Sequence, residues 1–140
     1  MATIEDAIQE MVDELKNVSG LRRVPDAPPE TNDQFPFATL IPSDGSFGGR
    51  AAGEMIGLHN VEIHLHVQRK DLARAYDDIM PLLTDIPVQL MSARLNERFS
   101  ALETWSDPIT YVWAPSSWQN TPTLAFVFTV PDVKIIEAFT

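Results

Sequence analysis

The segment Glu54–Lys70 reads EMIGLHNVEIHLHVQRK and decides the fold. From Val61 to Val67, apolar and polar residues alternate without a break, which is the pattern of a β-strand with one buried face. The apolar set is Val61, Ile63, Leu65 and Val67, and the polar set is Glu62, His64, His66 and Gln68. Because a shift of one residue would expose all four apolar side chains, this strand also fixes the register of its neighbours.

The composition predicts one globular domain that spans residues 1–140. Of the 140 residues, 44% are hydrophobic and 21% are charged, which is enough apolar surface for a substantial core. The chain has no cysteine, so disulfides, thiolate metal sites and cysteine nucleophiles are excluded.

The chain is strongly acidic, with 20 acidic and 10 basic residues and a formal net charge of -10. Such a surface repels the nucleic acid backbone, so no nucleic-acid-gripping surface is expected. The first residues are acidic where a signal peptide would be basic, and no apolar run approaches the roughly 20 residues that cross a bilayer. We therefore expect a soluble protein that is made in the cytoplasm and has no membrane partner.

Two long segments have helical periodicity. Thr3–Val18 has Thr3 as its cap, Asp6 in a capping-box position and Gly20 as a terminator. Asp71–Leu83 has Asp71 as its cap, and Pro81 predicts a kink or an end near Met80. A short third helix is expected over Val88–Leu95, with Pro87 at its first position.

The connector Leu21–Gln34, with three prolines, is expected to be ordered but neither helix nor central strand, and Pro28 and Pro29 favour polyproline geometry. A short strand is expected over Phe35–Ile41. The glycine-rich stretch Pro42–Gly53 is expected to be a flexible loop that joins this strand to the one in Glu54–Lys70 as a long hairpin.

The last third of the chain has the pattern of short strands and turns. The predicted strands are Phe99–Trp105, Ile109–Ala114, Thr123–Val130 and a short addition in the tail Val133–Thr140, and the predicted turn is Pro115–Pro122. Thr123–Val130 is apolar on both faces, so it is either central in the sheet or at a subunit interface. The expected fold is therefore an α+β two-layer sandwich of order α-β-β-α-β-β, in which two main helices pack on one face of a mainly antiparallel sheet of four to five strands.

Residues that carry chemistry are sparse. His64 and His66 share a strand face two residues apart, which is a spacing for a metal pair, but Glu62 is the only nearby carboxylate on that face. The serines lack a nucleophile-elbow pattern, and the glycine cluster lacks the lysine of a phosphate loop. We expect neither an enzyme nor a bound cofactor.

Several large side chains are candidates for a protein interface. Phe47 and Arg50 lie on the glycine-rich stretch, where an aromatic residue is either a local anchor or a partner contact. The tryptophans of the last third are either core residues or interface anchors. The interface candidates are Phe47, Arg50, Trp113, Trp118, Phe126 and Phe128. The outer face of the first helix, which is acidic, is either solvated or part of a functional acidic surface.

The layout resembles the tail terminator and tail completion proteins of long-tailed, siphovirus-like bacteriophages. The resemblance rests on the acidic first helix, the connector VPDAPPE followed by FPFATLIP, the glycine-rich hairpin, the strand VEIHLHVQ and the helix DLARAYDDIMPLL. It covers most of the chain and lies in the order of the predicted elements and in their residue patterns rather than in one short motif.

The resemblance implies a virion structural protein of the tail-neck region. It implies a ring, usually of six copies, that sits on the tail tube protein, ends tube elongation and offers the surface on which a head completion or neck protein joins. Genomic DNA would pass through such a ring without specific binding. The alternatives are another neck component, such as a head completion or connector protein, and a small metal- or ligand-binding domain that uses His64 and His66.

Overall fold

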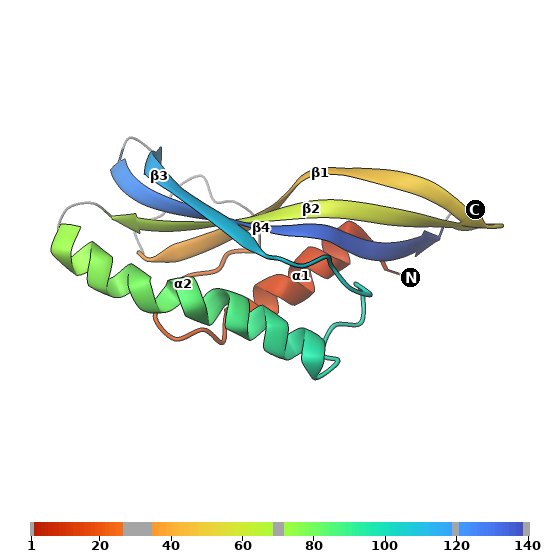
Figure 1. Cartoon of the computed structure of the whole chain (residues 1–140), viewed down its shortest axis with the longest axis horizontal. Helices are drawn as coiled ribbons and strands as arrows, with labels where there is room; N and C mark the ends of the chain where they lie inside the picture. Colours follow the sequence, from red (N-terminus) through yellow and green to blue (C-terminus); the bar gives the residue numbers. More distant parts are fainter. Residues whose placement is uncertain (1, 27–34, 69–71, 119–120, 139–140) are drawn as a thin grey trace.

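The computed structural model describes residues 2–26, 35–68, 72–118 and 121–138. The elements are α1 (Ile4–Leu15), β1 (Phe37–Ala51), β2 (Glu54–Gln68), α2 (Leu72–Leu95), β3 (Thr110–Trp118) and β4 (Thr121–Ala138). The four strands form one antiparallel sheet in the order β1-β2-β4-β3 (Figure 1). The predicted α+β class and antiparallel sheet are confirmed, and the sheet has four strands over the described ranges.

Some expectations concern parts of the chain that are not described. The polyproline geometry of Pro28 and Pro29, the cap at Asp71 and the last residues, Phe139 and Thr140, lie outside the described residues.

Strand β2 lies between β1 and β4 and pairs with both over most of its length. Val61, Ile63 and Leu65 are each fully buried, as their alternation predicts. Leu65 is opposite Ala38 on β1 and Phe126 on β4, so one face of three neighbouring strands is apolar. Strand β4 is central, between β2 and β3, which accounts for its two largely apolar faces.

Helix α1 begins with the predicted capping box. The Thr3 hydroxyl accepts a hydrogen bond from the Asp6 N–H, and the Thr3 N–H donates to the Asp6 carboxylate. The helix ends at Leu15, before the predicted end at Val18, and Gly20 has the positive φ of 99° that the sequence predicts.

The acidic face of α1 is partly used within the molecule. The Glu10 carboxylate accepts hydrogen bonds from the N–H and hydroxyl of Ser100 and from the Ala101 N–H. Glu14 pairs with Arg98 at 2.9 Å. These two carboxylates hold the segment after α2 against α1, so they are not free to form an acidic surface.

Helix α2 corrects the prediction of two helices with a break near Met80. It is continuous from Leu72 to Leu95, with Pro81 and Pro87 in its interior. Each proline removes one intrahelical hydrogen bond. The helix continues because one stripe of apolar side chains stays buried on both sides of the prolines. These buried residues are Ile79, Leu82, Ile86, Leu90 and Ala93.

The glycine-rich stretch is not a flexible loop. It forms the second half of β1, which pairs with β2 as far as Ala51, and only Ala52 and Gly53 remain as the turn. Gly53 has a positive φ of 77°, which a side chain would disfavour. The hairpin was predicted, but its strands are about twice as long as expected because the glycines take part in the ladder.

Three further predictions in the last third are wrong. Phe99–Trp105 forms no strand and makes one isolated bridge, from Thr104 to Lys134. The predicted turn Pro115–Pro122 and the separate tail strand are also corrected, because β3 extends to Trp118 and β4 runs through Pro131 to Ala138. A bulge opposite His59 and Val61 lets β4 accommodate Pro131.

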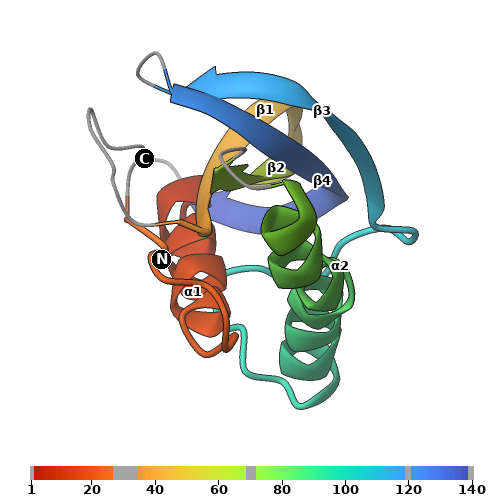
Figure 2. The ribbon, with the colours of Figure 1, turned by 90° about the vertical axis from the view of Figure 1, so that its left-hand side faces the viewer.

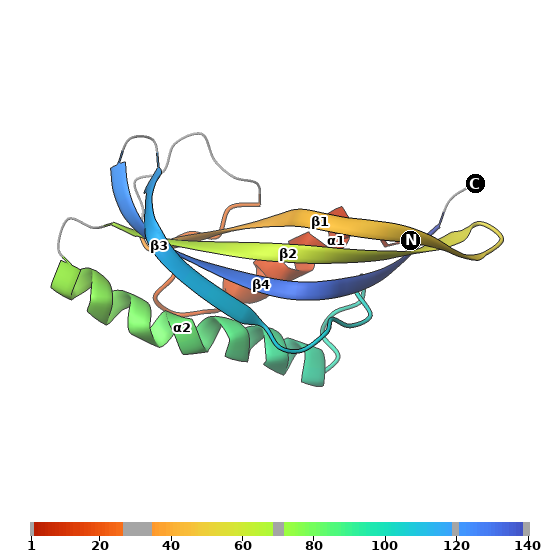
Figure 3. The same cartoon turned by 45° about the horizontal axis from the view of Figure 1, so that its top comes forward.

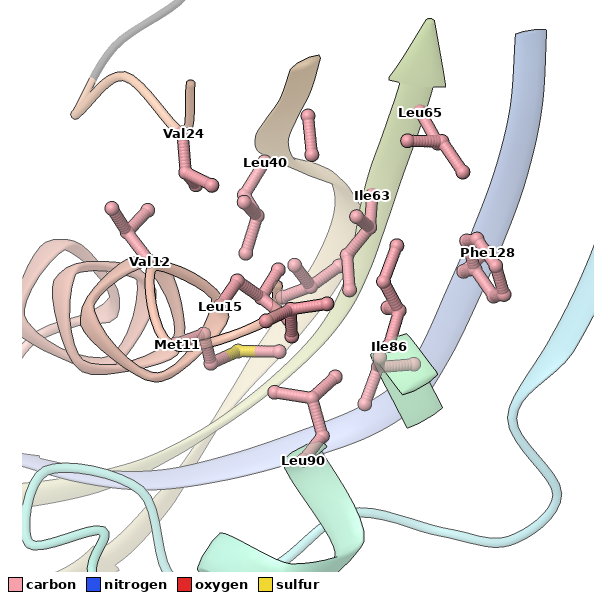
Figure 4. Close-up of a cluster of buried hydrophobic side chains, with 14 of the residues drawn as sticks. Met11, Val12, Leu15, Val24, Leu40, Ile63, Leu65, Ile86, Leu90 and Phe128 are labelled. Atoms are coloured by element: carbon pink, nitrogen blue, oxygen red, sulfur yellow. The ribbon is translucent and has the colours of Figure 1, made fainter. Parts of the chain in front are cut away.

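The core lies between the helices and the sheet. Figure 4 shows Met11 and Leu15 of α1 beside Ile63 of β2, with Ile86 and Leu90 of α2 close by. In Figure 2, α1 and α2 lie next to each other. Their buried side chains therefore share one cluster with the apolar strand residues.

Candidate interaction surfaces

The sheet extends past both helices at one end. We call the part of the sheet that carries this extension the distal arm, and it consists of residues 44–51 of β1, 54–59 of β2 and 133–138 of β4. At its base, Val133 and Ile135 still belong to the core. Figures 1 and 3 show that the tip of the β1–β2 hairpin projects well beyond α1 and α2. Strand β3 pairs only with residues 121–129 of β4, so the distal arm has three strands. There β4 is an edge strand, and the bridge between Thr104 and Lys134 lies against it.

The two candidates on the distal arm are both accessible. Phe47 is 59% exposed, and its ring makes an edge contact with the His59 ring at a centroid distance of 5.1 Å. Arg50 pairs with Glu54 across the turn at 3.4 Å, and both side chains are nearly half exposed. Such an exposed pair contributes little to stability, so Arg50 can exchange partners at low cost.

Beneath Phe47 lies a buried polar pair that the sequence did not reveal. The His59 and Glu137 side chains are 7% and 9% exposed, and His59 Nε2 lies 3.7 Å from Glu137 Oε2. The other oxygen of Glu137 accepts a hydrogen bond from the N–H of Ile4, in the first turn of α1. A carboxylate is favourable at this positive end of the helix. The pair therefore ties the distal arm to α1.

The second surface is at the opposite end of the sheet. Tyr111, Val112 and Trp113 of β3 are 55%, 66% and 61% exposed, and we call these three residues the β3 rim. The Tyr111 and Trp113 rings lie over Phe126 and Phe128 of β4 at centroid distances of 6.0–6.3 Å. Three exposed apolar residues in sequence on an edge strand are unusual for an isolated monomer.

The remaining interface candidates differ in accessibility. Phe126 is 9% exposed and Phe128 is 1% exposed, so both belong to the core of the subunit. Trp118 is the last residue of β3, and its side chain lies outside the described residues. Among the aromatic candidates whose side chains are described, Phe47 and Trp113 are thus exposed to solvent, and Tyr111 joins them.

His64 and His66 lie next to each other, with ring centroids 6.3 Å apart. His64 Nε2 is 2.9 Å from the Glu62 carboxylate, and the His66 ring stacks on Phe37 at 4.8 Å. In the described ranges, no group of three or more His, Asp or Glu side chains is arranged to hold a metal ion. The two imidazoles alone do not make a tetrahedral site.

The environment of His66 predicts a pH dependence of stability. Burial, and to a smaller extent the charge of His64, lowers the pKa of His66 to about 4, below the ordinary value of about 6.5. The unfolded chain therefore takes up this proton first as the pH falls. The contribution of neutral His66 is complete above about pH 6.5 and is lost progressively toward pH 4.

We expect the wild type to lose about 1 kcal/mol more unfolding free energy between pH 7 and pH 5 than a His66→Gln variant, which cannot titrate there. Urea denaturation at the two pH values measures this difference. Equal losses in the two proteins would contradict the assignment to His66.

Sequence reasoning missed Tyr111, Val112, His59 and Glu137. Alternation in residues 110–114 predicts a strand but not that the strand is an edge, and nothing in the sequence pairs residues 59 and 137.

No helix in the described part of the chain is long and apolar enough to span a bilayer. Comparison with models of protein families gives no match for this chain, and comparison with curated proteins gives none either.

Proposed function

We propose that the protein is a structural subunit of a phage virion that assembles into a ring of six copies. The ring caps the tail tube, ends its elongation and provides the surface on which the head joins. The observation that carries the proposal is the pair of unlike surfaces at the two ends of the sheet. The distal arm presents Phe47 at one end, and the β3 rim presents three apolar side chains at the other.

Unlike surfaces favour head-to-tail association. When two different patches of one subunit bind each other and the rotation closes, the product is a ring with cyclic symmetry. Aromatic residues such as Phe47 and Trp113 are typical anchors of such contacts. The resemblance to tail terminators, which rests on the sequence layout, supplies the copy number and the position in the virion.

We further propose that α1 and α2 form a single layer on one face of the sheet. Their buried residues share one cluster with Ile63 and Leu65, which supports this arrangement. A single helical layer leaves the distal arm and the β3 rim free for neighbouring subunits.

The acidic composition is compatible with the proposed ring. A net charge of -10 repels the DNA backbone, so DNA passes through the channel without binding. The proposed partners are further copies of this chain, the tail tube protein and a head completion or neck protein. The assembled protein belongs to the virion, in the region between head and tail, after synthesis in the host cytoplasm.

Light scattering coupled to size exclusion, followed by negative-stain microscopy, tests the ring. We expect a hexamer or a ring, either alone at high concentration or after addition of tail tube protein. A chain that stays monomeric under both conditions would argue against the proposal. Capture with purified tube protein or with head completion protein separates a terminator from another neck component, because the two bind different rings.

The distal arm yields a specific prediction. Replacing Phe47 with serine and Arg50 with alanine should leave the monomer folded, because both side chains are exposed. Loss of an aromatic anchor of about 2 kcal/mol should weaken association by more than tenfold. Circular dichroism checks the fold, and light scattering over a dilution series measures association.

The control is Leu95→Ser, which removes an 83% exposed apolar side chain at the end of α2 that belongs to neither surface. This variant should associate like the wild type. If the Phe47 and Arg50 variant associates equally well, the distal arm is not part of the interface.

A further inference from the structure

The sheet is divided by a line of irregularities that crosses three strands at one level. On one side of β2, the pairing with β1 jumps from Pro42 to Asp44 between adjacent β2 residues. On the other side, the pairing with β4 jumps from Val130 to Val133 across His59 and Val61. Both neighbours of β2 therefore carry an extra residue at the level of Asn60.

Bulges of this kind bend a sheet and increase its twist. The bulges of β1 and β4 both lie beside Asn60, one on each side of β2. The bend therefore crosses the three strands at the same level. This line separates the distal arm from the rest of the sheet. It also coincides with an interruption of the ladder, so fewer backbone hydrogen bonds resist rotation there than elsewhere in the sheet.

The side chain of Asn60 connects the two bulges. Its Nδ2 donates to Asp44 Oδ1 of β1 at 2.7 Å, and its Oδ1 accepts from the Asp132 N–H of β4 at 3.1 Å. The Asn60 carbonyl also accepts from the Ser43 hydroxyl at 3.1 Å. The Asn60 amide can donate to one bulge through its nitrogen and accept from the other through its oxygen at the same time.

The bulge of β4 is itself held from outside the sheet. Asp132 has a φ of 52°, and its carboxylate accepts from the Ser106 hydroxyl at 3.0 Å. The Ser106 N–H donates to the Pro131 carbonyl at 2.9 Å. The Asp132 N–H, which left the ladder, therefore has a fixed position from which it reaches Asn60.

We propose that Asn60 is a positioning residue that sets the angle between the distal arm and the rest of the sheet. With the amide in place, the arm has one direction. Without it, the bend remains and Glu137 still holds the β4 part of the arm to α1. The two bulges are no longer connected, however, and the arm samples a wider range of directions. This proposal concerns the isolated subunit and does not depend on ring formation.

The experiment measures the direction of the arm by distances between two spin labels. The chain has no cysteine, so Gly48→Cys and Thr84→Cys introduce the only two labelling sites. Gly48 is on the arm, where an added Cβ would meet no atom within 4 Å, and Thr84 is exposed on α2. Pulsed dipolar spectroscopy of the full chain should give one narrow distance distribution for the labelled parent.

Asn60→Ala should broaden or shift this distribution. Hydrogen exchange of arm amides should also become about tenfold faster relative to amides of the inner sheet, which is the effect of losing about one net hydrogen bond. The matched control is Asn17→Ala, which removes an amide whose hydrogen bond runs to the Asp13 carbonyl within one turn, and it should change neither quantity.

An exchange of donor and acceptor separates positioning from a general loss of stability. Asn60→Asp keeps the acceptor for the Asp132 N–H but faces Asp44 with a second carboxylate, so it should also broaden the distribution. Adding Asp44→Asn returns a donor to this contact and should restore the narrow distribution. A parent-like distribution in Asn60→Ala, or a double variant that remains as broad as Asn60→Asp, would overturn the proposal.

Discussion

Replacing Phe128 with alanine is expected to lower the free energy of unfolding by about 3–5 kcal/mol. Phe128 is 1% exposed and lies on β4, opposite Ile63 of β2 and Tyr111 of β3. Figure 4 shows it in the cluster of buried side chains that also contains Ile63 and Ile86. The truncation removes the transfer energy of a whole ring and leaves a cavity that the sheet cannot close. Urea denaturation followed by circular dichroism measures the loss.

The control is Trp113→Ala on the β3 rim. Trp113 is 61% exposed, so its removal should change the stability of the monomer by no more than about 1 kcal/mol. The two variants thus separate the aromatic candidates into one that maintains the fold and one that is available to a partner. A Phe128→Ala variant as stable as the wild type would mean that β4 is not central to the core.

This separation marks the limit of what the sequence predicts about β4. Its alternation and its double apolar face predicted a central or interface strand, and the central position is confirmed. The alternation of residues in β4 does not predict which residues of the neighbouring edge strand β3 the helices leave exposed. That depends on how far α2 extends under β3, which is a property of the tertiary packing.

Local signals succeeded where the decisive interactions are local. The Thr3 and Asp6 capping box and the positive φ of Gly20 involve residues within a few positions, and both are confirmed. The alternation of β2 was equally reliable because both neighbouring strands bury the same face. The contacts of Glu10 and Glu14 with residues 98–101 span more than 80 positions and left no local signal.

The failures share one cause, which is that long-range packing overrode a local preference. Pro81 and Pro87 indicate helix ends, yet the buried stripe of α2 keeps the helix continuous. Residues 99–105 have the composition of a strand. Leu102 and Trp105 are buried as strand residues would be. The segment is nevertheless not a strand, because it pairs with β4 through a single bridge. Propensity is a weak prior in both cases.

The glycines of the distal arm are the clearest instance of this override. Four glycines within twelve residues indicate a loop, but two of the glycines in the hairpin are required by the strand pairing itself. An added Cβ at Gly57 would lie 2.5 Å from Glu137 Oε2 and 2.6 Å from His59 Nε2. The missing side chains thus make room for the buried His59 and Glu137 pair.

Gly45→Ala is therefore expected to destabilise the protein by about 2 kcal/mol. The new Cβ would lie 2.7 Å from the Leu58 carbonyl oxygen and 2.8 Å from His59 Nδ1. The Leu58 oxygen is a backbone atom of the paired strand, so β1 and β2 must separate to relieve the clash. The His59 ring cannot move away easily, because it is buried beside Glu137 and under Phe47. Chemical denaturation measures the loss, and hydrogen exchange should place it in the arm.

Gly48→Ala is the matched control for this substitution, three residues further along the same strand. Nothing lies within 4 Å of a Cβ at Gly48, and neither glycine has a positive φ. Alanine there restricts the unfolded chain without a clash, so stability should stay equal or rise by about 0.5 kcal/mol. If both variants lost the same stability, the cost would come from the backbone preference of glycine. A loss confined to Gly45→Ala means that the glycine is needed because the strands approach closely around His59.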